Sequence, residues 1–288
     1  MPIPNLTIIG ESINDSVPST HRFFEANDIT GLKELAVFQD AAGAGYIDVN
    51  VGPRTAAFLA EMVRHVQSVT TRPLSIDTPD PAMAEAGLAA YDRDRAGGLM
   101  PILNSISPLR MEMFQLTRIM PFMPILLASE RVENGIGKPN HTAHDVYQTA
   151  RRMVEAAVSH GIPPAHCIID PAISPIGADS EGRFQCLMGA IRLIHADPDL
   201  KDVHMSVGLS NFSVMLPPKR ADGSPTKGPL ESAFLTLAVP LGMDHVIGSV
   251  KRTYNLLPPD HPAMRCLNDC LQLEGFDVIM RVQEYYAG

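Results

Sequence analysis

The chain has 288 residues, of which 45% are hydrophobic and 19% are charged, a composition typical of a globular protein with an ample core. Its formal net charge is −9, which argues against nucleic acid or an anionic membrane surface as the main partner and leaves a small molecule or another protein. The length exceeds that of most single domains but still permits one large domain of about 250 residues.

The sequence carries no recognisable targeting or disulfide signal. Residues 1–10 lack a basic segment followed by an apolar run, so no signal peptide is expected. No apolar run approaches the roughly 20 residues that span a bilayer. The four cysteines form no CxxC pair and are too few for a disulfide framework in a chain of this length. We therefore expect a cytoplasmic protein with no membrane and no nucleic-acid partner.

In chain order, short apolar segments alternate with segments of helical periodicity. A polar loop to about residue 30 separates the first strand from its helix. The fifth strand contains Pro124, which has no backbone N–H to donate to a neighbouring strand. The expected strands are 6–10, 46–51, 72–76, 100–103, 122–128, 167–169, 203–207 and 243–247. The expected helices are 32–42, 55–69, 78–91, 108–118, 142–161, 184–196, 230–239 and 263–286, the last interrupted at Gly275.

Eight strand-helix units in this order predict one α/β domain over residues 1–288, a (β/α)₈ TIM barrel in which function lies in the loops after the strands. Thr142 and Asp145 form a capping-box pattern at the start of the clearest helix. Residues 217–229 form a basic, proline-rich loop, which we expect to be a mobile cover over the barrel mouth.

Polar residues recur where the apolar segments end. Because the carboxyl ends of parallel strands meet at one mouth of a barrel, these side chains are expected to converge there. The candidates are Glu11, Asp48, Asn50, Asp77, Asn104, Asp170, and Gly208, Ser210 and Asn211 of the run Gly-Leu-Ser-Asn.

Each candidate also has a purely structural interpretation. A lone Asp or Asn at a strand end is most often a turn former or a helix cap, and we prefer this role for Thr78 and Asp80. Asp48 and Asn50 point to the same side of a strand, so one of them is a candidate for a hydrogen-bonded polar group inside the barrel. The joint occurrence of the others favours a functional site.

No metal site is expected. His141 and His144 lie three residues apart at a helix start without an accompanying Cys or carboxylate, which favours a surface capping role. Cys266 and Cys270, four residues apart, are expected to be two core residues on one helical face.

Six motifs, each at an expected strand end, carry a resemblance to a known family. They are Ile-Ile-Gly-Glu-Ser-Ile-Asn (8–14), Ile-Asp-Val-Asn-Val-Gly (47–52), Ser-Ile-Asp-Thr (75–78), Leu-Asn-Ser (103–105), Ile-Asp-Pro (169–171) and Gly-Leu-Ser-Asn (208–211). Nearly the whole chain resembles the pterin-binding barrels, and most closely the methyltetrahydrofolate:corrinoid-protein methyltransferases, which include the folate domain of cobalamin-dependent methionine synthase. The resemblance implies a homodimer that uses tetrahydrofolate or methyltetrahydrofolate as substrate and cobalamin carried by a partner corrinoid protein.

The resemblance also implies roles for the candidate residues. Asp77, Asn104 and Asp170 match family positions that contact the pterin, whose donor and acceptor edge suits carboxylates and amides. Gly208 would let the pterin ring approach the backbone. Asn211 matches the asparagine that hydrogen-bonds N5 of the folate and assists methyl transfer. Glu11, Asp48, Asn50 and Ser210 complete the expected substrate-binding set.

The sequence departs from the family pattern at one place, and two alternatives stay open. Acetogen-type members carry a glutamine and an arginine where this chain has Val214 and Lys219, which puts the corrinoid contacts in question. The basic loop 217–229 would suit either the glutamate tail of a folate or an acidic carrier surface. The alternatives are a folate-binding subunit without turnover and dihydropteroate synthase, whose anion-binding arginines are missing at 210–212 and 247–249.

Overall fold

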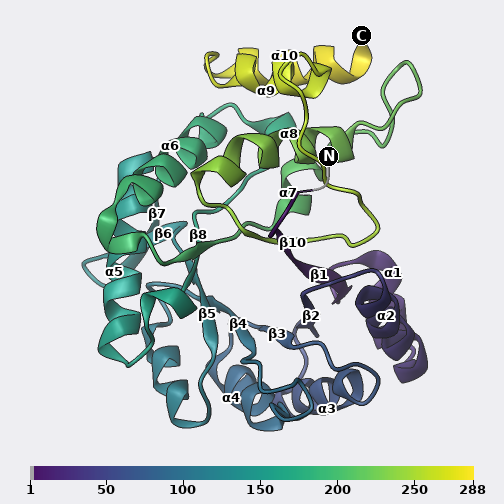
Figure 1. Ribbon diagram of the computed structural model, residues 1–288, viewed down its shortest axis with the longest axis vertical. Helices are drawn as coiled ribbons and strands as arrows, with labels where there is room; N and C mark the ends of the chain where they lie inside the picture. Colours follow the sequence, from purple (N-terminus) through teal and green to yellow (C-terminus); the bar gives the residue numbers. More distant parts are fainter. Residues whose placement is uncertain (1–2) are drawn as a thin grey trace.

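The computed structural model describes residues 3–288, in which eight parallel strands form a ring enclosed by helices (Figure 1). The strand order is β10-β1-β2-β3-β4-β5-β8-β9. Parallel bridges between Met205 and Met243 and between Gly208 and Ile247 join the two outermost strands and close the barrel. The predicted (β/α)₈ TIM barrel is confirmed.

The described residues contain ten strands and ten α-helices. The strands are β1 Thr7–Asn14, β2 Tyr46–Asn50, β3 Leu74–Asp77, β4 Ile102–Ile106, β5 Met123–Leu127, β6 Glu130–Glu133, β7 Ile136–Pro139, β8 Ile168–Asp170, β9 His204–Met205 and β10 His245–Gly248. The helices are α1 Pro18–Glu25, α2 Ile29–Ala41, α3 Ala56–Gln67, α4 Pro81–Ala90, α5 Ala143–Ser159, α6 Arg183–Ala196, α7 Leu209–Ser213, α8 Lys227–Ala238, α9 Pro262–Cys270 and α10 Phe276–Ala287. Among residues 3–288, no helix has the length and apolar character needed to cross a bilayer.

Alternation along the strands separates two apolar regions. In β2, Ile47 and Val49 belong to the large core between the strands and the helices, because side chains of neighbouring residues in a strand point to opposite faces. A second, smaller cluster of Ile9, Ile102, Ile125 and Ile168 comes from four different strands. This cluster packs inside the barrel, and the polar strand ends lie one step further along the same strands, toward the mouth.

Local sequence signals explain where several helices begin. The hydroxyl of Thr142 accepts from the Asp145 amide while the Asp145 carboxylate accepts from the Thr142 amide, so the predicted capping box at α5 is confirmed. The Asp80 side chain accepts from the Met83 amide at the start of α4, as expected for a cap residue. Gly275 separates α9 from α10, which confirms the predicted interruption.

Two segments differ from the sequence prediction. β1 extends to Asn14, and the expected loop after it contains α1, a two-turn helix with only Thr20 and Phe24 buried, so its apolar periodicity is weak. Residues 130–139 form the hairpin β6–β7, which was not expected. Its turn has positive φ at both Asn134 and Gly135, the conformation that an Asn-Gly pair favours in a two-residue hairpin loop.

The expected cover over the mouth is wrong. The loop 217–229 lies against the C-terminal helix α10 (Figure 1). The Arg220 Nε donates to the Tyr285 carbonyl at 2.7 Å, and its guanidinium lies 4.7 Å from the centre of the Tyr285 ring. The Ala221 amide donates to the Tyr286 carbonyl at 2.9 Å. These contacts hold the loop at the outer wall of the barrel.

Candidate active site

A cavity of about 710 Å³ opens at the carboxyl ends of the barrel strands. Strand ends and the loops after them build it, as the barrel topology requires. It collects seven of the nine predicted site residues, far apart in sequence: Glu11, Asp77, Asn104, Asp170, Gly208, Ser210 and Asn211.

The remaining two candidates, Asp48 and Asn50, lie behind the cavity wall. Asn50 Nδ2 donates to Asp77 Oδ2 at 2.8 Å, and its carbonyl oxygen accepts from the Gly52 amide at 2.9 Å. Asn50 therefore fixes one oxygen of the Asp77 carboxylate. Its place in the structure is that of a support for Asp77.

Asp48 is fully buried, and neither of its carboxyl oxygens has a hydrogen-bond donor among the protein groups around it. Burial and the neighbouring charge of Asp77 raise the pKa of Asp48 well above its usual range. Burial also raises the pKa of Asp77, although Asn50 and Asp48 partly oppose that shift. A protonated Asp48 beside an ionised Asp77 satisfies both groups, because two adjacent carboxyls share one proton more readily than they carry two charges.

Asp170 ends β8 and lines the cavity. Its Oδ1 accepts from the Ala172 amide at 2.8 Å, and Ala172 has a φ of 67°, a left-handed conformation that is unusual for a residue with a Cβ. Burial raises the pKa of Asp170 to about 6, and the Ala172 hydrogen bond opposes this shift. The carboxylate is thus largely ionised at neutral pH and available to accept hydrogen bonds from a ligand.

Asn211 lies on the short helix α7, which follows β9, the neighbour of β8. No protein group within residues 3–288 hydrogen-bonds the Asn211 side chain, and this amide lines the cavity. A Cβ at Gly208 would lie 2.8 Å from Asn211 Nδ2. Glycine at 208 therefore gives the Asn211 amide its space.

Glu11, on β1, contacts Ser210, the residue before Asn211. The Ser210 hydroxyl donates to Glu11 Oε2 at 2.8 Å. Burial raises the pKa of Glu11, while Ser210 and the positive charge of Arg252 oppose the shift. Arg252 also donates to the fully buried Glu231 at 2.6 Å, so one guanidinium balances two carboxyls.

Comparison with known proteins places this chain in a family. A family model described as pterin binding enzyme matches residues 19–248. The chain belongs to the pterin-binding enzymes. This membership confirms the resemblance carried by the six strand-end motifs, and the 710 Å³ cavity is called the pterin cavity below.

Named relatives fall into two groups. A methylcorrinoid:tetrahydrofolate methyltransferase of Eubacterium limosum is 28% identical over 251 residues, which cover 84% of this chain and 84% of that protein. Among solved structures, dihydropteroate synthase from Xanthomonas albilineans in complex with 7,8-dihydropteroate has a TM-score of 0.52 and 16% identity, covering 95% of this chain and 96% of that one. The Yersinia pestis synthase with a pterine-sulfa conjugate gives 0.52 and 12%, with coverage of 93% and 95%. At these identities the solved structures show the fold alone.

Several residues outside the nine candidates also line the pterin cavity, and of these Val17 and Ser129 carried no sequence signal. Asn14 and Val17 reach it because β1 is longer than expected and α1 follows at once. Ser105 lies within β4 and belongs to the motif Leu-Asn-Ser, while Ser129 follows the end of β5 outside any motif. Val214 lines the cavity three residues after Asn211 and is 55% exposed.

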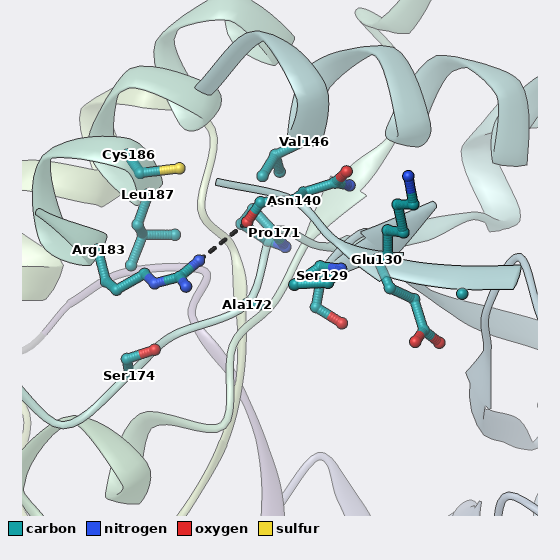
Figure 2. Close-up of a pocket in the computed structure, with 13 residues that line it drawn as sticks. Ser129, Glu130, Asn140, Val146, Pro171, Ala172, Ser174, Arg183, Cys186 and Leu187 are labelled. Carbon is teal, nitrogen blue, oxygen red and sulfur yellow. Dashed lines mark hydrogen bonds between the residues drawn. The ribbon is translucent and has the colours of Figure 1, made fainter. Parts of the chain in front are cut away.

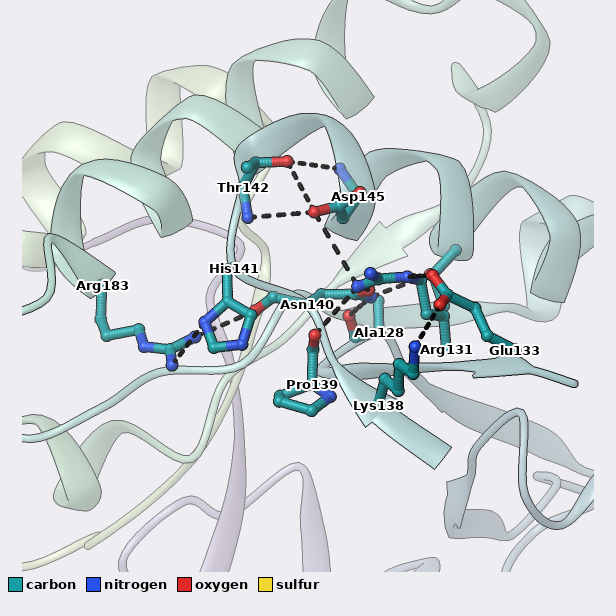
Figure 3. Close-up of polar contacts among 11 residues, drawn as sticks. Ala128, Arg131, Glu133, Lys138, Pro139, Asn140, His141, Thr142, Asp145 and Arg183 are labelled. Carbon is teal, nitrogen blue, oxygen red and sulfur yellow. Dashed lines mark hydrogen bonds and ion pairs between the residues drawn. The ribbon is translucent and has the colours of Figure 1, made fainter. Parts of the chain in front are cut away.

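A second cavity of about 350 Å³ lies beside the first, on the side of the hairpin, and shares Ser129 and Ala172 with it (Figure 2). Arg183 lines it, but its guanidinium donates to the Asn140 carbonyl at 2.9 Å and pairs with Glu181 at 2.7 Å. Lys138 pairs with Glu133 at 2.7 Å (Figure 3). The cations of this cavity are therefore already neutralised by the protein.

One group of possible metal ligands lies at the amino ends of β9 and β10, although none was expected from the sequence. Asp244 Oδ2 lies 2.6 Å from His204 Nδ1, and Asp244 Oδ1 lies 2.8 Å from His245 Nδ1. These contacts use one ring nitrogen of each imidazole for hydrogen bonds within the protein. Both oxygens of Asp244 are thus already partnered within the protein.

Proposed function

We propose that this chain transfers a methyl group between N5 of tetrahydrofolate and the cobalt of a corrinoid carried by a partner protein. The observation that carries the proposal is the free Asn211 amide, which lines the same cavity as Asp77, across the ring on β3, and Asp170, on the neighbouring strand β8. The relative from Eubacterium limosum, named for the same substrates, supports it.

Asp77, Asn104 and Asp170 supply the pattern that a pterin edge requires. The 2-amino group and the adjacent ring N–H form a planar pair of donors, which one carboxylate accepts together. Asp170 suits this contact because it is buried and holds one oxygen in place through Ala172. Asp77 and Asn104 lie at matched positions of neighbouring strands and suit the adjacent ring nitrogens.

The methyl transfer itself needs help at N5. In one direction the methyl leaves without its bonding electrons and joins the cobalt, whose electron pair forms the new bond, while N5 keeps the old pair and takes a proton. In the other direction these changes reverse. A hydrogen bond from the Asn211 amide that strengthens as charge develops on N5 lowers the barrier in both directions.

The carrier protein must present its corrinoid at the barrel mouth, because N5 lies inside the pterin cavity in this pose. The chain then acts by positioning two substrates and by electrostatics, with no covalent intermediate of its own. The name of the relative sets the methylcorrinoid first, but microscopic reversibility leaves both directions open to the same residues.

The alternatives have weaker support. Dihydropteroate synthase chemistry needs cations for a diphosphate, and the strand ends that would carry them read Ser210-Asn211-Phe212 and Ile247-Gly248-Ser249. A folate-binding subunit without turnover has no use for an unpaired amide at N5, because simple binding gains nothing from a contact tuned to the transition state.

The deciding experiment follows the absorbance of free cob(I)alamin with methyltetrahydrofolate under anaerobic conditions, and methylcobalamin with tetrahydrofolate in reverse. Free corrinoid removes the need for the carrier. Protein-dependent transfer that falls in Asn211→Ala is the expected result. Tight folate binding without transfer in either direction, also when corrinoid-loaded carrier candidates are supplied, would favour the binding subunit.

A further inference from the structure

A third cavity, of about 470 Å³, lies between the loop 217–229 and the segment after β10, and we call it the loop pocket. Besides the polar side chains of Ser232, Thr253 and Asn255, its walls include three prolines with a leucine, and two cationic side chains with a histidine. They are Pro218, Pro225, Pro229 and Leu257, and Lys227, Arg252 and His261. An apolar wall with basic groups suits a flat apolar ring that carries carboxylates.

The loop pocket adjoins the pterin cavity at two points. Lys227, which lines the loop pocket, donates its Nζ to the carbonyl of Val214 at 3.2 Å, and Val214 lines the pterin cavity. Arg252 lines the loop pocket, and its charge acts on Glu11 in the wall of the pterin cavity. A ligand leaving the pterin cavity over Val214 therefore passes close to Lys227.

The pose in the proposed function sends a folate tail in this direction. With the pyrimidine end of the pterin on Asp170 and N5 beside Asn211, C6 is the next ring atom after N5. C6 carries the p-aminobenzoyl-glutamate tail, so the tail leaves on the side of Asn211 and away from Asp170. The loops after β9 and β10, which build the loop pocket, lie on that side.

The charge balance also favours an anion. Arg220 pairs with Asp222 at 3.1 Å and Arg252 with Glu231 at 2.6 Å, but no carboxylate of residues 3–288 lies within ion-pair distance of Lys227. Burial and the positive charges of Arg220 and Arg265 lower the pKa of His261, while the charge of Asp260 opposes the shift. Because Nδ1 of His261 accepts from the Ala263 amide at 3.1 Å, its Nε2–H is left as a neutral hydrogen-bond donor to a bound carboxylate.

We propose that the loop pocket binds the p-aminobenzoyl-glutamate tail of the folate, with the ring against the prolines and Leu257 and the glutamate carboxylates on Lys227 and His261. This inference rests on the proposed function. It makes the basic loop a folate specificity element, and it predicts that added glutamate residues strengthen binding through further carboxylates.

The test compares three ligands under anaerobic conditions by calorimetry: 6-methyltetrahydropterin without a tail, tetrahydrofolate, and its triglutamate. Lys227→Met keeps the side-chain stem and removes the charge. We expect it to weaken triglutamate binding by about 5- to 20-fold, as for the loss of one charge-assisted hydrogen bond, and to leave the tailless pterin unchanged. Lys227→Arg should keep wild-type affinity, and Lys138→Met in the second cavity is the matched control.

Three outcomes would overturn the inference. Equal affinity of the pterin and the triglutamate in the wild type would place the tail in solvent, while the proposed function would stand. An unchanged triglutamate affinity in Lys227→Met, with weaker carrier binding, would assign the loop to the carrier protein instead. Failure of all three ligands to bind a folded wild-type chain would remove the proposed function and the inference together.

Discussion

The carboxyl groups at the two ends of the barrel differ in their partners. The floor is the end formed by the amino ends of β9 and β10, and the mouth is the end formed by the carboxyl ends of the strands. At the floor, Asp244 is hydrogen-bonded by two imidazoles at 2.6 and 2.8 Å, and although burial raises the pKa of Asp244, these partners hold it well below its usual range. At the mouth, Asp48, Asp77 and Asp170 have no cation beside them, and burial raises the pKa of each.

The difference separates stability from function. A carboxylate that gains partners on folding stabilises the native state, and Asp244 with its two histidines is such a group. Carboxyls buried without a cation and with oxygens left unpartnered cost free energy, and groups of this kind cluster where a ligand later supplies the missing donors. The mouth is therefore the place where substitutions should change chemistry, and the floor the place where they should change the free energy of unfolding.

The largest expected effect at the mouth is that of Asn211→Ala. Because the amide is free in the unliganded chain and would hydrogen-bond N5 most strongly in the transition state, its loss should slow methyl transfer by about 10- to 1000-fold with little change in folding. Single-turnover transfer at saturating folate is the measurement. If folate binding vanished while the rate at saturation stayed normal, Asn211 would be a binding residue only.

Asp170→Asn should weaken tetrahydrofolate binding by about 10- to 100-fold at pH 7.5, because the amide cannot accept both pterin donors. The pKa of Asp170 near 6 adds a pH signature. In the wild type, affinity should be full well above that pKa and should fall as the pH drops through it. Calorimetry from pH 5 to pH 8 tests this, and an unchanged pH profile in Asp170→Asn would assign the titration to another group.

At the floor, Asp244→Asn should reduce the free energy of unfolding by about 1 to 2 kcal/mol, a value discounted for the partial exposure of these groups. The midpoint of thermal unfolding should then fall by roughly 2 to 6 °C. Methyl transfer by the folded variant should stay at the wild-type rate. A variant that lost activity but kept its thermal midpoint would reverse the assignment of the two ends.

The pKa shifts of Asp244 and His204 determine how the free energy of unfolding depends on pH at the floor. The pKa of Asp244 is lowered in the folded chain, so its contribution is present above the unfolded value of about 3.9 and is lost as the pH falls toward the folded one. The hydrogen bond that His204 donates to Asp244 raises the pKa of His204, so that contribution is present below about pH 6.5 and is lost as the pH rises through the folded value. The difference in the free energy of unfolding between wild type and Asp244→Asn should therefore be larger at pH 6 than at pH 8.5.

Sequence predicted the mouth better than the floor, and the reason is physical. A polar residue at a strand end is visible in the local sequence, because it directly follows a short apolar segment. Once eight strands were counted, the polar ends could be expected to meet, and they are Asp77, Asn104, Asp170 and Asn211. His204 and Asp244 are 40 residues apart, and their contact depends on the way β9 and β10 close the ring, which no local pattern records.

The sequence also did not reveal the consequences of the β2–β3 pairing or the packing of the loop 217–229. Asp48 and Asn50 lie two residues apart on one strand, yet one is sealed inside and the other supports Asp77, a difference set by the pairing of β2 with β3. The basic, proline-rich composition of the loop 217–229 suggested a mobile cover, but Arg220 donates a hydrogen bond to α10, at the C-terminal end of the chain. Only the three-dimensional arrangement made it the wall of a pocket.

The smallest effect is expected for Asp48→Asn, and it is the sharpest test of how the mouth holds its charge. If Asp48 carries a proton at neutral pH, an amide replaces it as a donor to Asp77, and methyl transfer should stay within about 3-fold of wild type. Infrared difference spectra should show a protonated carboxyl band at pH 7 that Asp48→Asn removes. Because the folded pKa of Asp48 is raised, ionisation destabilises the wild type as the pH rises, and Asp48→Asn should lose less stability over the same range. A complete loss of pterin binding in a folded Asp48→Asn chain would mean that Asp48 is ionised and that the mouth holds two adjacent charges.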